Sequence, residues 1–487
     1  MSDELLLALC LSLPVGVAAL VATLHRRHDL REAVTLAGSI ALFGCVLGLL
    51  PAVLAGARPS LVVIEMLPGL ALALRAEPLG VLFALVASGL WIVNSLYSIG
   101  YMRANEESHQ TRFYACFALA LAATMGVALA SNLLTLFLCY ELLTLVTWPL
   151  VTHHGDAEAR AGGRVYLGLL LGTSMALLLP AIIATWAFAG TLEFTPGGIL
   201  GGAGLSGTML SGLLALYMFG IGKAALMPVH RWLPAAMVAP TPVSALLHAV
   251  AVVKAGVFTV VKVIVYVFGL DAFDGMRAVD WLPAVAGFTI LAASVVALRA
   301  DNLKRRLAYS TVSQLSYVVL SASLLAPLSV AAAALHIAAH AVAKITLFFA
   351  AGAIYTASGK TLVSELDGIG RRMPWTMAAF AVGALSLVGI PPAAGFLSKW
   401  LMFQGAAGAG HGFTLAVLAV STLLSAAYLL PIVHAAFLRQ PATASPAHGE
   451  APWPMVAAMM ITAAATLALP FAVLPLALAR SVAGVSP

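Results

Sequence analysis

The amino-acid sequence predicts an all-α protein that crosses a membrane many times. Of its 487 residues, 62% are hydrophobic and only 9% are charged, and the mean hydropathy is +1.02. A soluble domain carries roughly 25% charged residues. Apolar segments of about 20 residues, the length that crosses a bilayer as a helix, follow one another along the chain. We therefore predict about fourteen transmembrane helices, of which the seventh and the twelfth are discontinuous.

Short polar loops separate the predicted helices. Only Ser131 and Asn132 mark the break between the fourth helix and the fifth. The approximate apolar cores are 4–24, 31–55, 78–100, 112–130, 132–152, 164–189, 208–229, 241–268, 281–299, 304–325, 329–357, 375–402, 411–438 and 454–478.

The distribution of basic residues tests this topology. If the N-terminus is outside and every helix crosses, sixteen lysines and arginines fall in the inner loops and four fall in the outer loops. Such a bias follows the positive-inside rule. It predicts a multi-pass protein of the cell (inner) membrane with both termini on the outer side.

Helix-breaking residues interrupt two of the predicted helices. Gly220, Gly222 and Pro228 surround a lysine in the seventh, and the run GIPPAAG, residues 389–395, precedes a lysine in the twelfth. Proline removes a backbone donor, and broken backbone at membrane depth is tolerated where it is buried in protein or lines water. Discontinuous helices of this kind mark the ion sites of transporters.

A near-constant spacing suggests an internal repeat. Lys223 and Lys399 are 176 residues apart, and Lys254 and His434 are 180 apart. We predict two inverted five-helix repeats between flanking segments. The divisions are an N-terminal three-helix segment 1–110, a first repeat 111–270, a second repeat 271–440 and a C-terminal helix 441–487.

The composition also argues against several classes of function. The four cysteines are widely spaced in apolar segments, so neither a metal site nor an iron–sulfur cofactor is expected. The largest loops, about 20 residues, leave no room for a nucleotide or redox module. No basic run suggests nucleic acid. We expect no redox or hydrolytic chemistry in this chain, which leaves open whether it belongs to an enzyme complex.

Glu141 and Lys223 are the first candidate functional pair. Glu141 is the only acidic residue in the middle of a predicted helix, and Lys223 lies at the break of the seventh. Ionisable residues inside a membrane are costly and are functional by default. A lysine partner would keep the carboxylate ionised, and loss of that contact would release the lysine proton. The alternative is a satisfied buried carboxyl.

Three basic residues form a stripe on the eleventh helix. His336, His340 and Lys344 are spaced i, i+4, i+8, which places them on one helix face. Histidine titrates near neutral pH, so the stripe suits a proton relay. A polar packing face is the alternative, and a zinc pair lacks further ligands nearby.

Other basic residues complete the candidate set. His248 and Lys254 share the eighth helix but are six residues apart, so water or a helix break must connect them. Lys262, nearer the helix end, either joins the path or snorkels to the surface. His153 and His154 lie in a loop, and the role of His434 stays open.

Several motifs resemble one family. MPVHRWLPAAMVAPTPVSALLHAVAVVKAGVF, DNLKRRLAYSTVSQLSY, HIAAHAVAKITLFFAAG, GIPPAAGFLSKW and the glutamate of CYELLTL occur in family order over about residues 110–405. They resemble the antiporter-like membrane subunits: the proton-pumping subunits of respiratory complex I, the A and D subunits of Mrp-type sodium/proton antiporters, and relatives in membrane-bound hydrogenases. The turn AAMVAPTPVS departs from the more acidic family pattern at Ala235 and Ala236.

The resemblance implies fourteen core helices, an inverted repeat and roles for individual residues. Glu141 and Lys223 match the family's Glu–Lys pair, and Lys254 matches the eighth-helix lysine. The central stripe matches His336, His340 and Lys344, and Lys399 matches the terminal lysine. Protons would pass along this row, with His248 beside it, between two half-channels. Homologous and small membrane subunits, the lipid bilayer and protons would be its partners, with sodium left open.

Three hypotheses follow. The compact length and Lys399 favour a proton-translocating component like the D subunit of Mrp-type sodium/proton antiporters. The alternative is the same module in a redox-driven complex, either complex I-like or hydrogenase-like. A structural scaffold without transport is the third, and the intact lysines and histidines argue against it.

Overall fold

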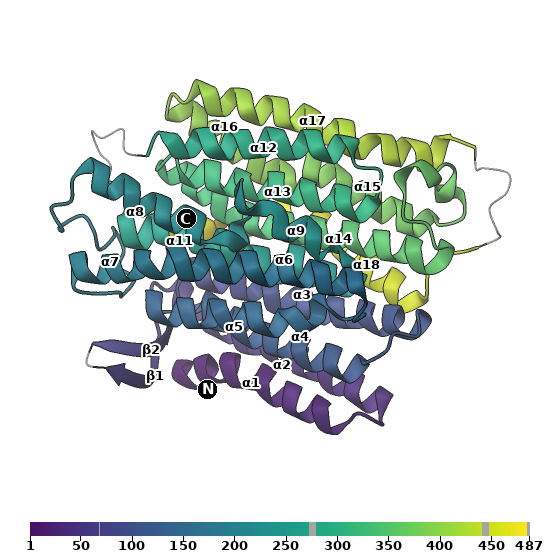
Figure 1. Ribbon diagram of the computed structural model, residues 1–487, viewed down its shortest axis with the longest axis horizontal. Coiled ribbons are helices and arrows are strands. Elements are labelled where there is room, and N and C mark those ends of the chain that lie inside the picture. The colour runs from purple at the N-terminus through teal and green to yellow at the C-terminus, as the bar shows by residue number, and fades with distance from the viewer. Residues whose placement is uncertain (68, 272–278, 441–447, 485–487) are drawn as a thin grey trace.

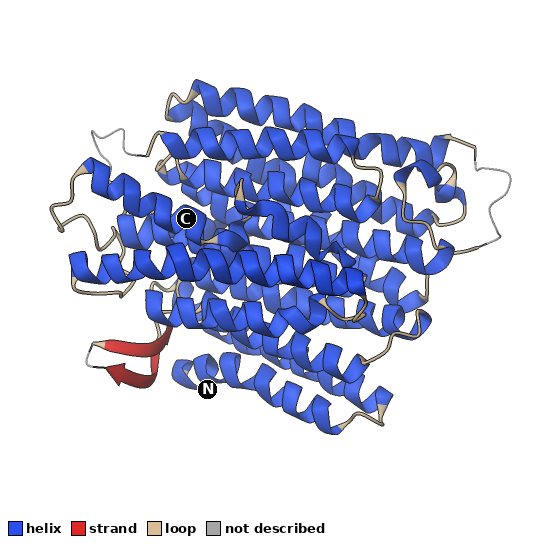
Figure 2. Cartoon of the chain, viewed as in Figure 1, coloured by secondary structure: helices blue, strands red, loops and turns tan. Residues whose placement is uncertain are grey.

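The chain folds into a bundle of long, roughly parallel and antiparallel helices in the computed structural model (Figures 1 and 2). The structure describes residues 1–67, 69–271, 279–440 and 448–484. The helices are α1 Asp3–Thr23, α2 His28–Leu54, α3 Pro78–Ala104, α4 Gln110–Ala128, α5 Leu133–Val151, α6 Ala157–Thr173, α7 Leu179–Ala189, α8 Gly207–Gly220, α9 Trp232–Ala235, α10 Thr241–Ala245, α11 Val252–Val263, α12 Trp281–Arg299, α13 Leu303–Ala322, α14 Pro327–Ser358, α15 Pro374–Val388, α16 Ala394–Gly408, α17 Gly412–Leu438, α18 Trp453–Ala468 and α19 Val473–Val482.

These helices confirm the all-α polytopic architecture. Within the described ranges, eleven are long and apolar enough to cross a membrane once segments that continue one another are joined. The three remaining crossings are the two broken segments and α13, whose serines, threonine and glutamine lower its hydropathy. The break between the fourth and fifth crossings is confirmed as well, because Asn132 caps α5 by accepting a hydrogen bond from the amide of Thr135 at 2.8 Å.

Two crossings form the buried axis of the bundle. The segment Thr241–Phe268, which joins α10 and α11 through a π-helical turn at Leu246–Val250, is completely buried across its apolar window, and so is that of α14. Figure 1 shows α1–α5 on one side of this axis and α12, α16 and α17 on the other. A spanning segment with no lipid-facing surface is free to carry polar side chains.

Both predicted discontinuities are present. After α8 ends at Gly220, a short 3-10 turn at Gly222–Ala224 is followed by Ala225 in the left-handed region (φ 55°), and the chain then folds through α9. After α15 ends at Val388, Gly389 (φ 93°) turns the chain, and the helix resumes as α16.

A β-hairpin is the main addition to the helical prediction. β1, Ser60–Leu67, pairs with β2, Leu70–Arg75, in antiparallel register. We call the end of the bundle that carries it the hairpin end. Figure 1 places both chain termini toward this end. The hairpin was not predicted, because SLVVIEML shows no regular alternation of polar and apolar residues and the run is too short to separate strand from loop.

The contacts between helices do not test the predicted division into two repeats, which is a statement about internal symmetry. The segment predicted as 441–487 begins with residues 441–447, which lie outside the described residues. The boundaries 1–110, 111–270 and 271–440 stay a prediction.

Candidate functional site: a buried row of basic side chains

The centre of the site is a contact between Lys254 of α11 and His340 of α14. The Lys254 Nζ and the His340 Nδ1 are hydrogen-bonded, and both side chains are buried. The two residues belong to the two fully buried crossings, which explains how a lysine and a histidine meet away from the lipid-facing surface. This contact joins the predicted eighth and eleventh helices directly.

Polar side chains of α13 hold the neighbouring basic groups. His248 Nδ1 is 3.0 Å from Thr311 Oγ1, and the Lys344 ammonium donates to Ser310 Oγ. His248 lies in the π-helical turn at Leu246–Val250, which precedes the start of α11 and Lys254. Ser310 and Thr311 of α13 therefore face the axis.

His336 connects the centre to the second broken crossing. Its Nδ1 is 2.8 Å from Ser398 Oγ on α16, and its Nε2 is 3.1 Å from the Gln314 side-chain oxygen on α13. Its ring lies 6.0 Å from the ring of His340. Histidine offers two ring nitrogens, one donor and one acceptor when neutral, so it can receive a proton on one side and pass one on from the other.

Lys399 lies at the break of the twelfth crossing. Its ammonium donates to the carbonyl oxygens of Leu387, at 2.7 Å, and Val388, at 3.2 Å. These are the last carbonyls of α15, which lack helical partners and carry the negative end of the helix dipole. The broken backbone thus provides the acceptors that keep a buried ammonium solvated.

Lys223 lies at the break of the seventh crossing and is held by α5. Its ammonium donates to the Tyr140 carbonyl at 2.8 Å and to Thr144 Oγ1 at 2.6 Å, and it lies 3.2 Å from the centre of the Tyr140 ring. The Tyr140 hydroxyl accepts from the Lys223 amide at 3.1 Å. Tyr140 and Thr144 were missed in the sequence, because their role depends on contacts about 80 positions away.

The predicted ion pair between Glu141 and Lys223 is open in this structure. The ion pairs within 4.0 Å in the described part of the chain do not include these two residues. Both Glu141 carboxylate oxygens are buried without a well-formed hydrogen bond to described residues. Ser174 faces them from a second π-helical turn, Ser174–Leu178, which lies between α6 and α7. Glu141 and Lys223 still interact electrostatically. The structure therefore places Lys223 on a second set of partners on α5, Tyr140 directly before Glu141 and Thr144 three residues after it.

Lys223, His248, Lys254, His340, Lys344, His336 and Lys399 form what we call the axial row. It runs from the first broken crossing, through the two buried crossings, to the second. Among the described residues, no three His, Cys, Asp or Glu side chains converge as metal ligands.

Lys262 does not snorkel to the surface. Its side chain is buried, and its ammonium pairs with Glu77 Oε2 at 3.0 Å and donates to the Ala130 carbonyl at 2.9 Å. The snorkelling alternative is therefore wrong, because Glu77, the residue directly before α3, offers a buried carboxylate that the position of Lys262 in the sequence does not reveal. A helix-end lysine turns inward when a buried carboxylate is available.

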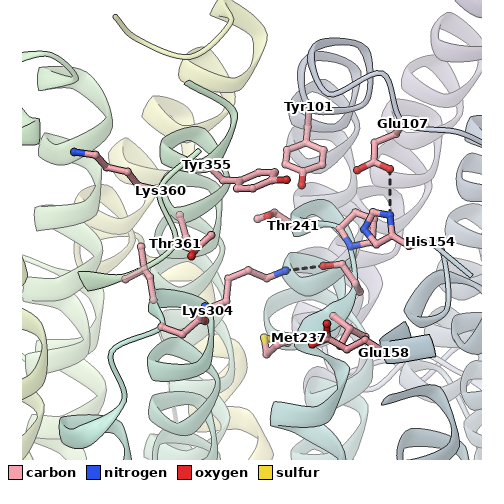
Figure 3. Close-up of a pocket in the computed structure, with 16 residues that line it drawn as sticks. Tyr101, Glu107, His154, Glu158, Met237, Thr241, Lys304, Tyr355, Lys360 and Thr361 are labelled. Carbon is pink, nitrogen blue, oxygen red and sulfur yellow. Dashed lines mark hydrogen bonds and ion pairs between the residues drawn. The ribbon is translucent and has the colours of Figure 1, made fainter. Parts of the chain in front are cut away.

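A cavity of about 370 Å³ opens at the end of the bundle opposite the hairpin (Figure 3). Lys304 reaches across it to the Ala239 carbonyl at 2.6 Å, and Glu107 lies 3.7 Å from His154. Its lining includes Thr241 of α10 and Ala351 of α14. From each of these, seven residues, or about 10 Å of helix, lead to His248 and Lys344 respectively.

Buried ionisable groups surround the mouth of this cavity. Burial lowers the pKa of His153 to about 4, and the positive charge of Arg112 adds to the effect. Burial also raises the pKa of the Glu107 carboxyl, against the opposing influence of His154 and then Lys304. His153 Nε2 is 3.7 Å from Glu107 Oε2. The loop histidines thus belong to a cluster of titratable groups, which their isolated position in the sequence did not indicate.

This cluster gives a prediction for stability against pH. The pKa of His153 is depressed on folding, from 6.5 to about 4, so the unfolded chain binds a proton that the folded chain refuses. The stabilisation is complete above pH 6.5 and is lost as the pH falls toward 4, by at most about 3 kcal/mol. Glu107, with a raised pKa, contributes with the opposite sign. We expect the apparent Tm in detergent, followed by tryptophan fluorescence, to decline less steeply for His153→Phe than for the wild type. If the Tm falls equally steeply with pH in both proteins, His153 is not the group responsible. A loss of packing in His153→Phe would lower the Tm equally at every pH and would leave the slope unchanged.

Comparisons with known proteins agree with this geometry. Residues 130–425 match the family described as NADH:quinone oxidoreductase/Mrp antiporter, TM. The chain is 33% identical over 381 residues to the A/B subunit of a probable K(+)/H(+) antiporter of Rhizobium meliloti (strain 1021), covering 77% of this chain but only 37% of that protein. It is 33% identical over 349 residues to NADH-quinone oxidoreductase subunit N of Desulforudis audaxviator (strain MP104C), covering 71% of this chain and 68% of that one.

The fold is likewise shared with a solved structure. A chain of the Mrp complex from Dietzia sp. DQ12-45-1b superposes with a TM-score of 0.88 at 23% identity, covering 99% of this chain and 97% of that one. The family match includes every member of the axial row together with both broken crossings. This multi-pass membrane protein belongs to the NADH:quinone oxidoreductase/Mrp antiporter transmembrane family.

Proposed function

We propose that this chain is a proton-translocating, antiporter-like subunit of a multisubunit membrane complex. The observation that carries the proposal is the axial row, a set of seven buried basic side chains that spans both broken crossings. Burying this many ionisable groups is costly, and residues of this kind at membrane depth mark ion and proton paths. Each member has at least one hydrogen-bond partner, and Lys254 and His340 bond each other directly, which supports the transfer of a proton between the two halves.

The proposed path uses the contacts of the row. Protons enter the cavity beside Glu107, reach His248 or Lys344, and cross between the two halves at the Lys254–His340 contact. His336 then passes them toward Lys399. In this mechanism Lys223 alternates between Glu141 and its present partners, Tyr140 and Thr144. Each exchange changes the positive potential at the start of the row and drives the next proton along.

The same proposal includes the partners of the chain, the kind of complex to which it belongs and its orientation in the membrane. The similar proteins are named as subunits of antiporters and of a quinone oxidoreductase, which supports homologous and small membrane subunits as partners. The superposition with a chain of the Mrp complex supports an Mrp-like component, and among these we propose one like the D subunit of Mrp antiporters. The sixteen-to-four distribution of loop lysines and arginines supports the inner membrane, with both termini outside.

A redox-driven complex is the second candidate. It is favoured by the similarity to NADH-quinone oxidoreductase subunit N. In that case the electron-transfer groups belong to partner subunits, and this chain contributes only the proton path. Co-purification with iron–sulfur proteins would favour this candidate over cation/proton exchange.

Proton uptake by vesicles that contain the assembled complex tests the proposal. We expect an imposed sodium or potassium gradient to drive uptake in the wild type. Glu141→Gln should slow it at least about tenfold, because the lost charge interaction in a low-dielectric core exceeds about 1.4 kcal/mol. Glu65→Gln, which removes an exposed hairpin carboxylate, is the matched control.

Two results separate the candidates. Uptake that needs an electron donor and ignores cation gradients would favour the redox-driven complex. A Glu141→Gln complex that moves protons at the wild-type rate under either driving force would refute the proposed role of the carboxylate.

A further inference from the structure

The ion pair between Glu77 and Lys262 has no part in the axial row, yet it lies on the same crossing. Lys262 follows Lys254 by eight residues, about 12 Å along the helix axis. Lys254, Phe258 and Lys262 are spaced i, i+4, i+8 and so share one face of the crossing. Along this face the crossing runs from Lys254, at the centre of the row, toward the hairpin end.

The pair is buried but borders a cavity. The Lys262 side chain is completely buried, whereas Glu77 is among the residues that line a cavity of about 440 Å³ at the hairpin end. Charged residues, Arg58, Arg75 and Asp271, line the same cavity. A charged lining favours water, so the carboxylate of Glu77 has solvent on one side and a buried ammonium on the other.

The surroundings of Lys262 keep it apart from the row. Its ammonium lies 4.4 Å from the centre of the Phe194 ring and 5.7 Å from that of Phe258. The Phe258 ring packs against Phe83 at 5.1 Å. Phe258 therefore stands as an apolar barrier between Lys254 and Lys262 in this structure. A proton that passes between the two lysines, about 12 Å apart along the helix axis, needs water in the space that the Phe258 ring now fills.

We infer that Glu77 and Lys262 form the proton gate of this chain at the hairpin end, a branch of the path separate from His336 and Lys399. The inference rests on the proposed proton translocation. Lys262 gives its proton to the Glu77 carboxylate, which leaves a neutral amine and a neutral acid. Glu77 releases that proton to water in the cavity. The amine takes the next proton from Lys254, so one proton moves from the row to the hairpin end.

Two charged groups from other elements lie outside the pair, on the side of the cavity. Arg75 of β2 lies 3.8 Å from Glu77 Oε1, and it pairs with Glu193 of the loop after α7 at 3.1 Å. Glu193 is half-exposed and does not contact Lys262 directly, which makes it the natural control. Of these two carboxylates only Glu77 touches the lysine, and Glu193 lies outside the gate.

Proton uptake by the assembled complex in vesicles tests the gate. We expect Glu77→Gln to reduce uptake severalfold, Glu77→Asp to restore part of it, and Glu193→Gln to leave it unchanged. The double variant Glu77→Gln with Lys262→Met separates transport from folding. Removing both charges of a buried pair is often neutral for stability, so this complex should assemble with a wild-type Tm and still transport slowly.

Wild-type uptake by the double variant would overturn the gate and leave the ion pair as a structural contact. Loss of uptake in Glu193→Gln equal to that in Glu77→Gln would also overturn it, because the effect would then belong to the charge of the cavity as a whole. These outcomes differ from failure of the proposed function. If Glu77→Gln is silent while Lys254→Met is inactive, only the gate fails, whereas a wild-type complex that moves no protons refutes translocation itself.

Discussion

Replacement of Lys254 by methionine should reduce proton uptake by vesicles containing the assembled complex to the background leak. Lys254 is the only member of the axial row on α11, and its contact with His340 joins the two halves. Methionine has a similar length and fits an apolar environment, so the bundle should remain packed. Removing a buried ammonium leaves no unpaired charge, since its partner is an imidazole.

A second substitution distinguishes a proton carrier from a fixed positive charge. Arginine keeps the charge but does not release a proton in proteins, so Lys254→Arg should be as inactive as Lys254→Met. Arg439→Met, which removes an exposed cation paired with Asp367, serves as the control for a lost surface charge. Wild-type uptake by Lys254→Arg would mean that Lys254 contributes only its positive charge and does not itself carry the proton.

Hydropathy and the cost of burial account for what could be predicted from the sequence. The crossing segments were predictable because length and apolarity alone determine them, and Lys223, Lys254 and Lys399 stood out because charges at membrane depth are rare. The two breaks were predictable because proline cannot continue a helix, and because glycine readily adopts the left-handed conformation that ends one, as Gly389 does at φ 93°.

Partners of the buried charges were not predictable, since they come from distant segments. The Tyr140 carbonyl that binds Lys223 is a backbone group, which no side-chain pattern reveals. Glu77 lies directly before α3, 185 residues from Lys262 in the sequence, and only the packing of the helices brings the two together. The open state of the Glu141–Lys223 pair was not predictable either, because the competing partners of Lys223 lie on the same helix as Glu141 and within three residues of it.

Gly256→Ala should impair proton uptake about as much as loss of Lys223, although it removes no titratable group. Gly256 lies on α11 against the break of the seventh crossing. A Cβ there would lie 2.3 Å from the Ala224 amide nitrogen and from the Lys223 carbonyl carbon. Backbone atoms cannot move aside as a flexible side chain can. The 3-10 turn that carries Lys223 must shift away from Tyr140 and Thr144.

Overpacking of this kind costs about 1–3 kcal/mol, so the apparent Tm should fall as well. Two other glycines separate the causes. Gly100→Ala crowds Met455 of α18 at 2.7 Å, remote from the axial row, and should lower the Tm while leaving the uptake per assembled complex unchanged. Gly212→Ala on α8 meets nothing within 4 Å and should change neither. If Gly256→Ala behaves like Gly100→Ala, with a lowered Tm and wild-type uptake, the position of Lys223 does not control transport. Uptake lost only in Gly256→Ala would show that α11 sets the geometry of the seventh-crossing lysine through a single close backbone contact.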